Sequence, residues 1–283
     1  MTVLTGHAPA GHYRFRHVAR MEWIKLRTLR SVRWSLLIAL AGMIGIGIAA
    51  GHNTVNPRGD VTSNILAGGA LGSLVFAVLG VLVATSEYSS GTIYATLAAI
   101  PRRPLVLAAK ASVFGVMALA AGELVTFGGF LAGAAFVRPG VPHPALSQPT
   151  VLRAVALSGA FLCLVGLIGL ALGAIVRHGA AALAAVVVLV FVAPLAGLAQ
   201  TPAGKFLPLL IYANSLGATQ PVSGFTLSPW AGLGIIACYA AVLLAAAGWL
   251  LSSRDALAGR WDHGRRRPGE RGPARAVHRA CPP

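Results

Sequence analysis

Charged side chains are scarce in this sequence. They make up 11% of its 283 residues, while 56% are hydrophobic and the mean hydropathy is +0.75. A soluble domain of this size usually carries about 25% charged residues, so this scarcity excludes an ordinary soluble fold. The 34 glycines fit the same class, since glycine is more frequent in membrane helices than in soluble ones. The composition predicts an all-α integral membrane protein that crosses the bilayer several times.

Cysteines are few and the common catalytic motifs are missing. Cys163 and Cys238 lie in apolar stretches and Cys281 lies in a polar tail, which gives no disulfide framework and no paired metal spacing. The sequence contains no H-E-x-x-H, no G-x-S-x-G and no paired aspartates within an apolar stretch. We therefore expect neither an intramembrane enzyme nor a metal site.

A nucleotide-binding P-loop is missing as well. Its G-x-x-x-x-G-K-[ST] pattern needs a hydroxyl residue after Gly-Lys, whereas the Gly204-Lys205 pair is followed by Phe206. We expect the chain to hydrolyse no ATP and to bind no cofactor itself. Any ATP-driven work would require a separate subunit that binds ATP and magnesium.

The long apolar stretches predict six transmembrane helices, since a bilayer core needs about 20 apolar residues per helix. A turn at Arg177, His178 and Gly179 separates the fourth from the fifth, and glycine pairs at spacing four suit close helix packing. These pairs are Gly47/Gly51, Gly129/Gly133 and Gly169/Gly173. The predicted spans are 34–51, 65–86, 105–137, 154–176, 180–200 and 230–251.

The basic residues predict the orientation. The net charge of +16 could suggest a nucleic-acid partner, but Lys and Arg flank the apolar stretches instead of forming a basic domain, which favours membrane lipid as their partner. Nineteen of the 23 fall on one side of the six spans, and Arg58, Arg138, Arg153 and Lys205 fall on the other. By the positive-inside rule, both termini are expected to be cytoplasmic, in a multi-pass protein of a bacterial cytoplasmic membrane.

Two polar segments flank the predicted membrane domain, 34–252. The leader, 1–33, interleaves apolar and basic residues, which predicts an amphipathic interfacial helix on the inner leaflet; a purely cytosolic helix is the alternative. The residues assigned to this helix surface are Glu22, Trp23, Lys25, Arg27 and Arg30. The tail, 253–283, is rich in Arg, Gly and Pro and is expected to be disordered.

A polar insert, EYSSGTIYATLAAIPRRPLVLAAK (87–110), separates the second and third spans. Its turn residues and Pro101 predict a short helix of about nine residues beneath the two spans. Glu87 could stabilise the N-terminus of that helix or pair with a basic residue of the leader. Arg102, Arg103 and Lys110 could bind lipid phosphate or carboxylates of a partner, or could serve only to fix the topology.

The insert resembles the E…GT…L…P.sR…K signature of type-2 ABC transporter permeases, the membrane subunits of many bacterial exporters. The leader, MEWIKLRTLRSVRW, is similar to the opening of actinobacterial members, and the resemblance covers roughly 15–252; Arg102 departs from the small residue usual before Arg103. It implies two permease copies, identical or sister chains, bound to two ATP-binding-cassette ATPase subunits, with a short cytoplasmic coupling helix seated in the ATPase. The residues implied to couple are Glu87, Gly91, Thr92, Leu97, Pro101, Arg102 and Arg103.

Glu123 lies near the middle of the third span. An acid at that depth costs about 2.5 kcal/mol or more unless it is partnered or lines a wet path. Glu123 could face a polar or cationic substrate, carry a proton, or make an interhelical hydrogen bond to a hydroxyl. The rivals of an exporter subunit are therefore a proton-coupled secondary transporter that uses Glu123 and a non-transporting membrane partner of an ATPase. The sequence does not identify a substrate.

Overall fold

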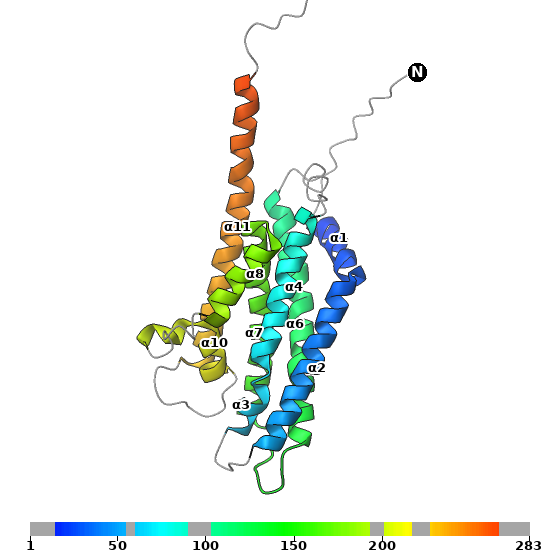
Figure 1. Ribbon diagram of the computed structural model, residues 1–283, viewed down its shortest axis with the longest axis vertical. Coiled ribbons are helices and arrows are strands. Elements are labelled where there is room, and N and C mark those ends of the chain that lie inside the picture. The colour runs from blue at the N-terminus through cyan, green and yellow to red at the C-terminus, as the bar shows by residue number, and fades with distance from the viewer. Residues whose placement is uncertain (1–14, 55–59, 90–102, 193–200, 217–226, 266–283) are drawn as a thin grey trace, which may run out of the picture.

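Every secondary-structure element in the described part of the chain is a helix. The computed structural model describes residues 15–54, 60–89, 103–192, 201–216 and 227–265 (Figure 1). Within these residues, five helices are long and apolar enough to cross a membrane. This confirms a multi-pass membrane protein built from α-helices. The bounds of the long helices are α2 Arg30–Asn53, α4 Gly69–Ser89, α6 Arg103–Ala135, α7 Pro149–Val176 and α11 Pro229–Arg265.

The prediction of six spans is confirmed only for five. The second span consists of α4 together with the short helix α3 (Val61–Leu66), whose N-terminus is capped by Asp60 Oδ1 accepting from the Ser63 N–H at 3.0 Å. At the place of the fifth predicted span, α8 (Gly179–Val187) continues into the π-helical turn η1 (Val188–Val192). Residues 193–200, the rest of that span, lie outside the described residues.

Helix α7 is the centre of the bundle, because it packs against α4, α6, α8 and α11. In its membrane span 67% of the residues are buried, against 22% for α2 and 17% for α11. The two outer helices therefore present most of their apolar surface away from the bundle. Figure 1 shows α2 and α11 on opposite sides of it.

The predicted glycine pairs lie where helix backbones touch. Gly47 and Gly51 of α2 face Gly129 and Gly133 of α6: a Cβ built on Gly51 would lie 2.3 Å from the Gly133 carbonyl oxygen. On α7, a Cβ on Gly169 would lie 2.4 Å from the backbone oxygen of Ala77 in α4. Small residues at these positions thus permit close helix approach, as expected.

A tighter contact of the same kind joins α4 and α7 at Gly80. A Cβ there would lie 2.0 Å from the Gly166 carbonyl oxygen and 2.8 Å from the Leu170 nitrogen. No side chain other than hydrogen fits between these backbones. Gly80 and Gly166 were not among the predicted pairs. The predicted pairs each share one helix at a spacing of four, whereas Gly80 and Gly166 lie on different helices and meet only in the folded bundle.

The turn predicted at residues 177–179 is confirmed. Helix α7 ends at Arg177, which has a positive φ of 60° and donates its N–H to the Gly173 carbonyl at 2.9 Å. His178 then caps α8, its Nδ1 accepting from the Ala181 N–H at 3.5 Å. A left-handed residue at this position satisfies a carbonyl of the last helical turn.

A segment between α8 and α11 folds back into the bundle. It contains the 3-10 helix η3 (Pro202–Phe206), the short helix α10 (Pro208–Ile211) and the π-helical turn η4 (Tyr212–Leu216). The Tyr212 hydroxyl donates to the Leu66 carbonyl, and its ring stacks on Phe161 with centroids 4.7 Å apart. This contact satisfies a carbonyl at the end of α3. The sequence leaves open a re-entrant hairpin within 212–229, and residues 217–226 of that segment lie outside the described residues.

Helix α11 is longer than the sequence predicts. It continues to Arg265, into the segment 253–283 for which we expected disorder. The segment up to that residue contains Ala and Leu and no proline, so nothing in it forbids a helix, and the first proline follows at Pro268. Residues 266–283 lie outside the described residues.

Candidate functional site

Four charged side chains from three helices meet at one end of the bundle. We call Glu22, Lys25, Glu87 and Lys110 the charge cluster, and the end of the bundle where they lie the α1 end. Glu22 and Lys25 belong to α1 (Phe15–Thr28), Glu87 to the last turn of α4, and Lys110 to the beginning of α6. Figure 1 shows these three elements together, opposite to α3.

Lys110 joins the two carboxylates. Its Nζ lies 2.7 Å from Glu22 Oε2 and 2.8 Å from Glu87 Oε1. The second lysine, Lys25, donates to the same two side chains, at 3.1 Å to Glu22 Oε1 and 2.9 Å to Glu87 Oε1. Two positive and two negative charges therefore form a neutral, hydrogen-bonded group.

The charge cluster is buried except at Lys25. The side chain of Glu22 is 1% exposed, those of Glu87 and Lys110 are each 8% exposed, and that of Lys25 is 37% exposed. Burying ions removes hydration worth several kcal/mol per ion, which only close pairing and hydrogen bonds offset. Each of the three buried groups is thus stable in place only while the others are present.

The sequence of α1 explains why Glu22 faces inward. Val18, Glu22 and Leu26 follow one another at a spacing of four and are the buried residues of this helix. Val18 also packs with Val106 and Ala109 of α6 in a small apolar cluster. Glu22 is consequently placed between two apolar contacts and directed at the beginning of α6.

The exposed face of α1 carries both apolar and basic side chains. Trp23 is 46% exposed and Ile24 54% exposed, and Arg16 and Arg20 are exposed as well. Contact of this mixed face with the inner leaflet stays a prediction. Arg27 and Arg30, the other residues assigned to this surface, are both exposed.

A second contact ties α7 to the same end. The guanidinium of Arg177 lies over the ring of Tyr88, 5.7 Å from its centroid. Tyr88 directly follows Glu87, so the end of α4 contacts α1, α6 and α7 within two residues. A cation over an aromatic face is stabilising by about 0.5–1 kcal/mol at an exposed site.

The electrostatic environment keeps Lys25 protonated. Partial burial by itself lowers the pKa of Lys25, but hydrogen bonds and charge interactions with Glu87 and Glu22 outweigh it and raise that pKa above its ordinary value. Lysine is charged below a pKa of about 10.4 in an unfolded chain. The ion pairs of Lys25 are therefore fully formed throughout the neutral range.

We expect the contribution of Lys25 to α1 docking to be lost at alkaline pH. Because its pKa is raised in the folded protein, the contribution is fully present below about pH 10.4 and declines as pH rises through the folded value. The measurement is the distance between spin labels on cysteines placed at Ala19 of α1 and Leu105 of α6, which both pack against the small apolar cluster between these helices. Wild type and Lys25→Met should differ at pH 8 and converge at high pH; a difference that persists unchanged would contradict the assignment.

Several site predictions can be compared with these contacts. Of the two roles considered for Glu87, pairing with a basic residue of the leader is the one observed. Lys110 contacts carboxylates of this chain, a role not considered for it, and Glu22 was placed only on the helix surface. The sequence did contain a signal for the burial of Glu22. This residue, one of seven acids in the chain, lies four residues after Val18 and four before Leu26, on the apolar side of the helix.

The predicted coupling residues lie mostly outside the described part of the chain. This applies to Gly91, Thr92, Leu97, Pro101 and Arg102 and to the short helix that they were predicted to form. The described chain stops at Ser89, two residues after Glu87, and resumes at Arg103, seven residues before Lys110. The charge cluster therefore binds together the two helices that enter and leave this segment.

Neither family models nor curated proteins match this chain. The function is therefore inferred from the residues themselves and from their geometry. Among the described residues, no group of three or more His, Cys, Asp or Glu side chains is arranged to hold a metal ion.

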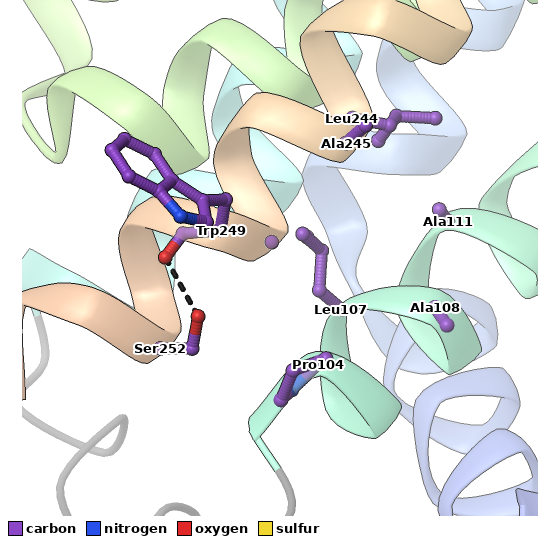
Figure 2. Close-up of a pocket in the computed structure, with 9 residues that line it drawn as sticks. Pro104, Leu107, Ala108, Ala111, Leu244, Ala245, Trp249 and Ser252 are labelled. Carbon is purple, nitrogen blue, oxygen red and sulfur yellow. Dashed lines mark hydrogen bonds between the residues drawn. The ribbon is translucent and has the colours of Figure 1, made fainter.

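An apolar groove lies between α6 and α11 at the α1 end. It has a volume of about 540 Å³ and runs along residues 104–111 of α6 and 244–252 of α11. Figure 2 shows Trp249 and Ser252 on one wall and Leu107 on the other. The Ser252 hydroxyl donates to the Trp249 carbonyl at 2.7 Å. The groove surface is mainly apolar, and Ser252 and the Trp249 indole are the polar side chains among its lining residues.

Glu123 lies on α6 away from both of these features. Its Oε2 is shielded from solvent and has no hydrogen-bond partner in the described structure. The carboxyl group rests against Gly159 of α7, where a Cβ would lie 2.6 Å from Cδ and 2.7 Å from both oxygens. A hydroxyl partner, one of the three possibilities raised by the sequence, is therefore not present among the described residues.

Proposed function

We propose that this chain is the membrane-spanning permease subunit of an ATP-binding-cassette exporter in a bacterial cytoplasmic membrane. The chain would work as a pair of permeases, with ATP and magnesium bound by separate ATPase subunits. Both termini and the α1 end would face the cytoplasm. The observation that carries the proposal is the charge cluster, because it joins the leader helix to both helices that flank the insert.

A permease subunit must transmit the movement of its ATPase to its own membrane helices. An ATPase that closes on ATP must displace a short element of the permease and thereby move its membrane helices. In this chain a displacement of segment 90–102 acts on the last turn of α4 and the first turns of α6, which the charge cluster holds to each other and to α1. The three helices would then move as one body, because separating them exposes unpaired buried charges.

The sequence supports the same function through its resemblance to a permease signature. The order Glu87, Gly91-Thr92, Leu97, Pro101, Arg103 and Lys110 resembles the permease signature. In this interpretation the first and last residues of the signature, Glu87 and Lys110, are there to pair with each other at 2.8 Å. A structural pairing at the two ends of a coupling element explains why both residue types are needed at that spacing.

The test is recovery of an ATPase with the tagged chain from mild detergent, identified by mass spectrometry. We expect a P-loop ATPase to copurify with wild type and with Lys205→Met, a lysine remote from the insert. Arg103→Ala and Glu87→Ala should recover several times less of it. Arg103→Ala removes a predicted contact of the partner, whereas Glu87→Ala removes a member of the cluster.

Failure would be informative if the chain is folded. A monodisperse preparation that brings down no ATPase, even with a non-hydrolysable ATP analogue present, would contradict the exporter function. The proton-coupled transporter would then be the leading alternative, because Glu123 places an acid without a described partner inside a membrane span.

A further inference from the structure

Glu123 occupies a laterally open position in the middle of a membrane span. Leu119 and Val116, four and seven residues earlier on α6, share its side of the helix and are 43% and 66% exposed. Glu123 itself is half-buried, with one oxygen shielded against α7. Glu123 therefore lies at the edge of an apolar stripe of α6 that is open to the surroundings.

The hydroxyl and thiol donors on the neighbouring turns of α6 and α7 are already used. Thr126 donates to the Gly122 carbonyl at 3.0 Å, Ser158 to the Ala154 carbonyl at 2.7 Å, and Cys163 to the Gly115 carbonyl at 3.3 Å. Each is a short contact from a side chain to a backbone carbonyl. The hydroxyl and thiol groups around the α6–α7 contact are thus committed to the helices themselves and leave the carboxyl group unsatisfied.

The described basic residues of α6, of the turn after it and of α7 lie about 9 Å or more from the level of Glu123 along the helix axes. Along α6 and the turn that follows it, Lys110 and Arg138 are each about 20 Å from Glu123 at 1.5 Å per residue. Lys110 is moreover paired with Glu22 and Glu87. On α7, Arg153 lies about 9 Å along the axis from Gly159 and has an interaction of its own. A carboxyl group in this position has the chemistry to accept a positive charge from outside the chain.

The space between α6 and α7 beside Glu123 is just large enough for its carboxyl group. Gly159 provides a notch, since even a methyl group there would overlap all three carboxyl atoms. Both carboxyl oxygens rest against Gly159, beside the exposed stripe that contains Leu119 and Val116. Apolar side chains on that stripe would contact the body of a ligand while the carboxylate neutralises its charge.

We propose that Glu123, seated in the Gly159 notch, is the binding site for a lipophilic organic cation transported by this protein. The inference rests on the exporter function proposed above and adds its substrate class. A delocalised cation with an apolar body loses little hydration on entering a membrane, and pairing with it stabilises an intramembrane carboxylate. Small inorganic cations would require several oxygen ligands, and Glu123 supplies one carboxyl group.

The test uses the full chain in lipid nanodiscs, with tetraphenylphosphonium as the cation and dicyclohexylcarbodiimide as the reagent. This apolar carbodiimide modifies protonated carboxyl groups inside membranes, and peptide mass spectrometry locates the modified residue. We expect modification at Glu123, slowed by tetraphenylphosphonium and not by the neutral triphenylphosphine oxide. Direct binding of radiolabelled tetraphenylphosphonium should be about tenfold or more weaker in Glu123→Gln, equivalent to about 1.4 kcal/mol or more.

Three further variants separate the site from folding. Glu123→Asp keeps an acid and should retain measurable binding. Gly159→Ala keeps Glu123 but fills the notch, so it should weaken binding while the chain still yields a monodisperse preparation. Gly45→Ala, at a glycine with no atom within 4 Å of the added carbon, should bind as wild type does.

The other outcomes overturn the proposal in distinct ways. Modification of Glu123 without protection by tetraphenylphosphonium would indicate a proton site. Unchanged tetraphenylphosphonium binding in Glu123→Gln would place the cation elsewhere. The exporter function is tested separately, because recovery of an ATPase should be the same for Glu123→Gln as for wild type whether or not the cation binds.

Discussion

Replacing Lys110 by methionine is expected to destabilise the protein more than any other single change at the α1 end. The variant leaves Glu22 and Glu87 buried with only the half-exposed Lys25 between them. Removing one partner of a buried ion pair typically costs about 3–5 kcal/mol. At roughly 2–4 °C per kcal/mol for a chain of this size, the melting temperature in detergent should fall by about 10 °C.

The same experiment distinguishes lost pairing from lost packing. Combining Lys110→Met with Glu22→Gln and Glu87→Gln removes the uncompensated carboxylates and should recover much of the lost stability. Lys205→Met, which alters a lysine outside the cluster, should melt as wild type does. If Lys110→Met is no less stable than this control, the four side chains do not form the buried group described here.

Replacing Gly80 by alanine is expected to disrupt the contact between α4 and α7. The added methyl group would lie 2.0 Å from the Gly166 oxygen, and backbone atoms on both sides cannot rotate away as a side chain can. Overpacking usually costs about 1–3 kcal/mol and more where the backbone must shift, so we expect a loss of about 3 kcal/mol or more. The measurement is thermal unfolding in detergent, together with the yield of monodisperse protein.

Gly45 of α2 provides the matched control. Nothing lies within 4 Å of a carbon added there, and alanine is favoured over glycine inside a helix by about 1 kcal/mol. Gly45→Ala should therefore be neutral or slightly stabilising. Equal effects of the two substitutions would show that the response reflects glycine content in general and not the approach of α4 to α7.

Much of the fold could be predicted from composition and periodicity. Apolar runs gave five of the spans because a helix must satisfy its own backbone in a bilayer, which requires a minimum length of apolar sequence. The pairs Gly47/Gly51 and Gly129/Gly133 indicated close packing because small residues at spacing four share a helix face. Which glycine faces which partner did not follow, since spacing along one helix carries no information about the neighbouring helix.

The candidate site was predicted in part. Glu87 and Lys25 were both selected, and pairing of Glu87 with a basic residue of the leader was one of two possibilities. Glu22 was placed on a helix surface, and Lys110 was expected to bind lipid phosphate or carboxylates of a partner, or only to fix the topology. Neither position reveals burial, because the residues are 88 apart in the sequence and meet only when α1 docks on α6.

The sequence by itself determined that the protein is a bundle of membrane helices, with polar segments before, between and after them. It did so because hydropathy, length and the positions of glycine are local properties. The tertiary structure alone decided that two carboxylates and two lysines from three helices neutralise one another, and that the Glu123 carboxyl group rests against Gly159. These outcomes depend on which surfaces meet, and the free energy of a charge is fixed by its neighbours in space and not by its neighbours in the chain.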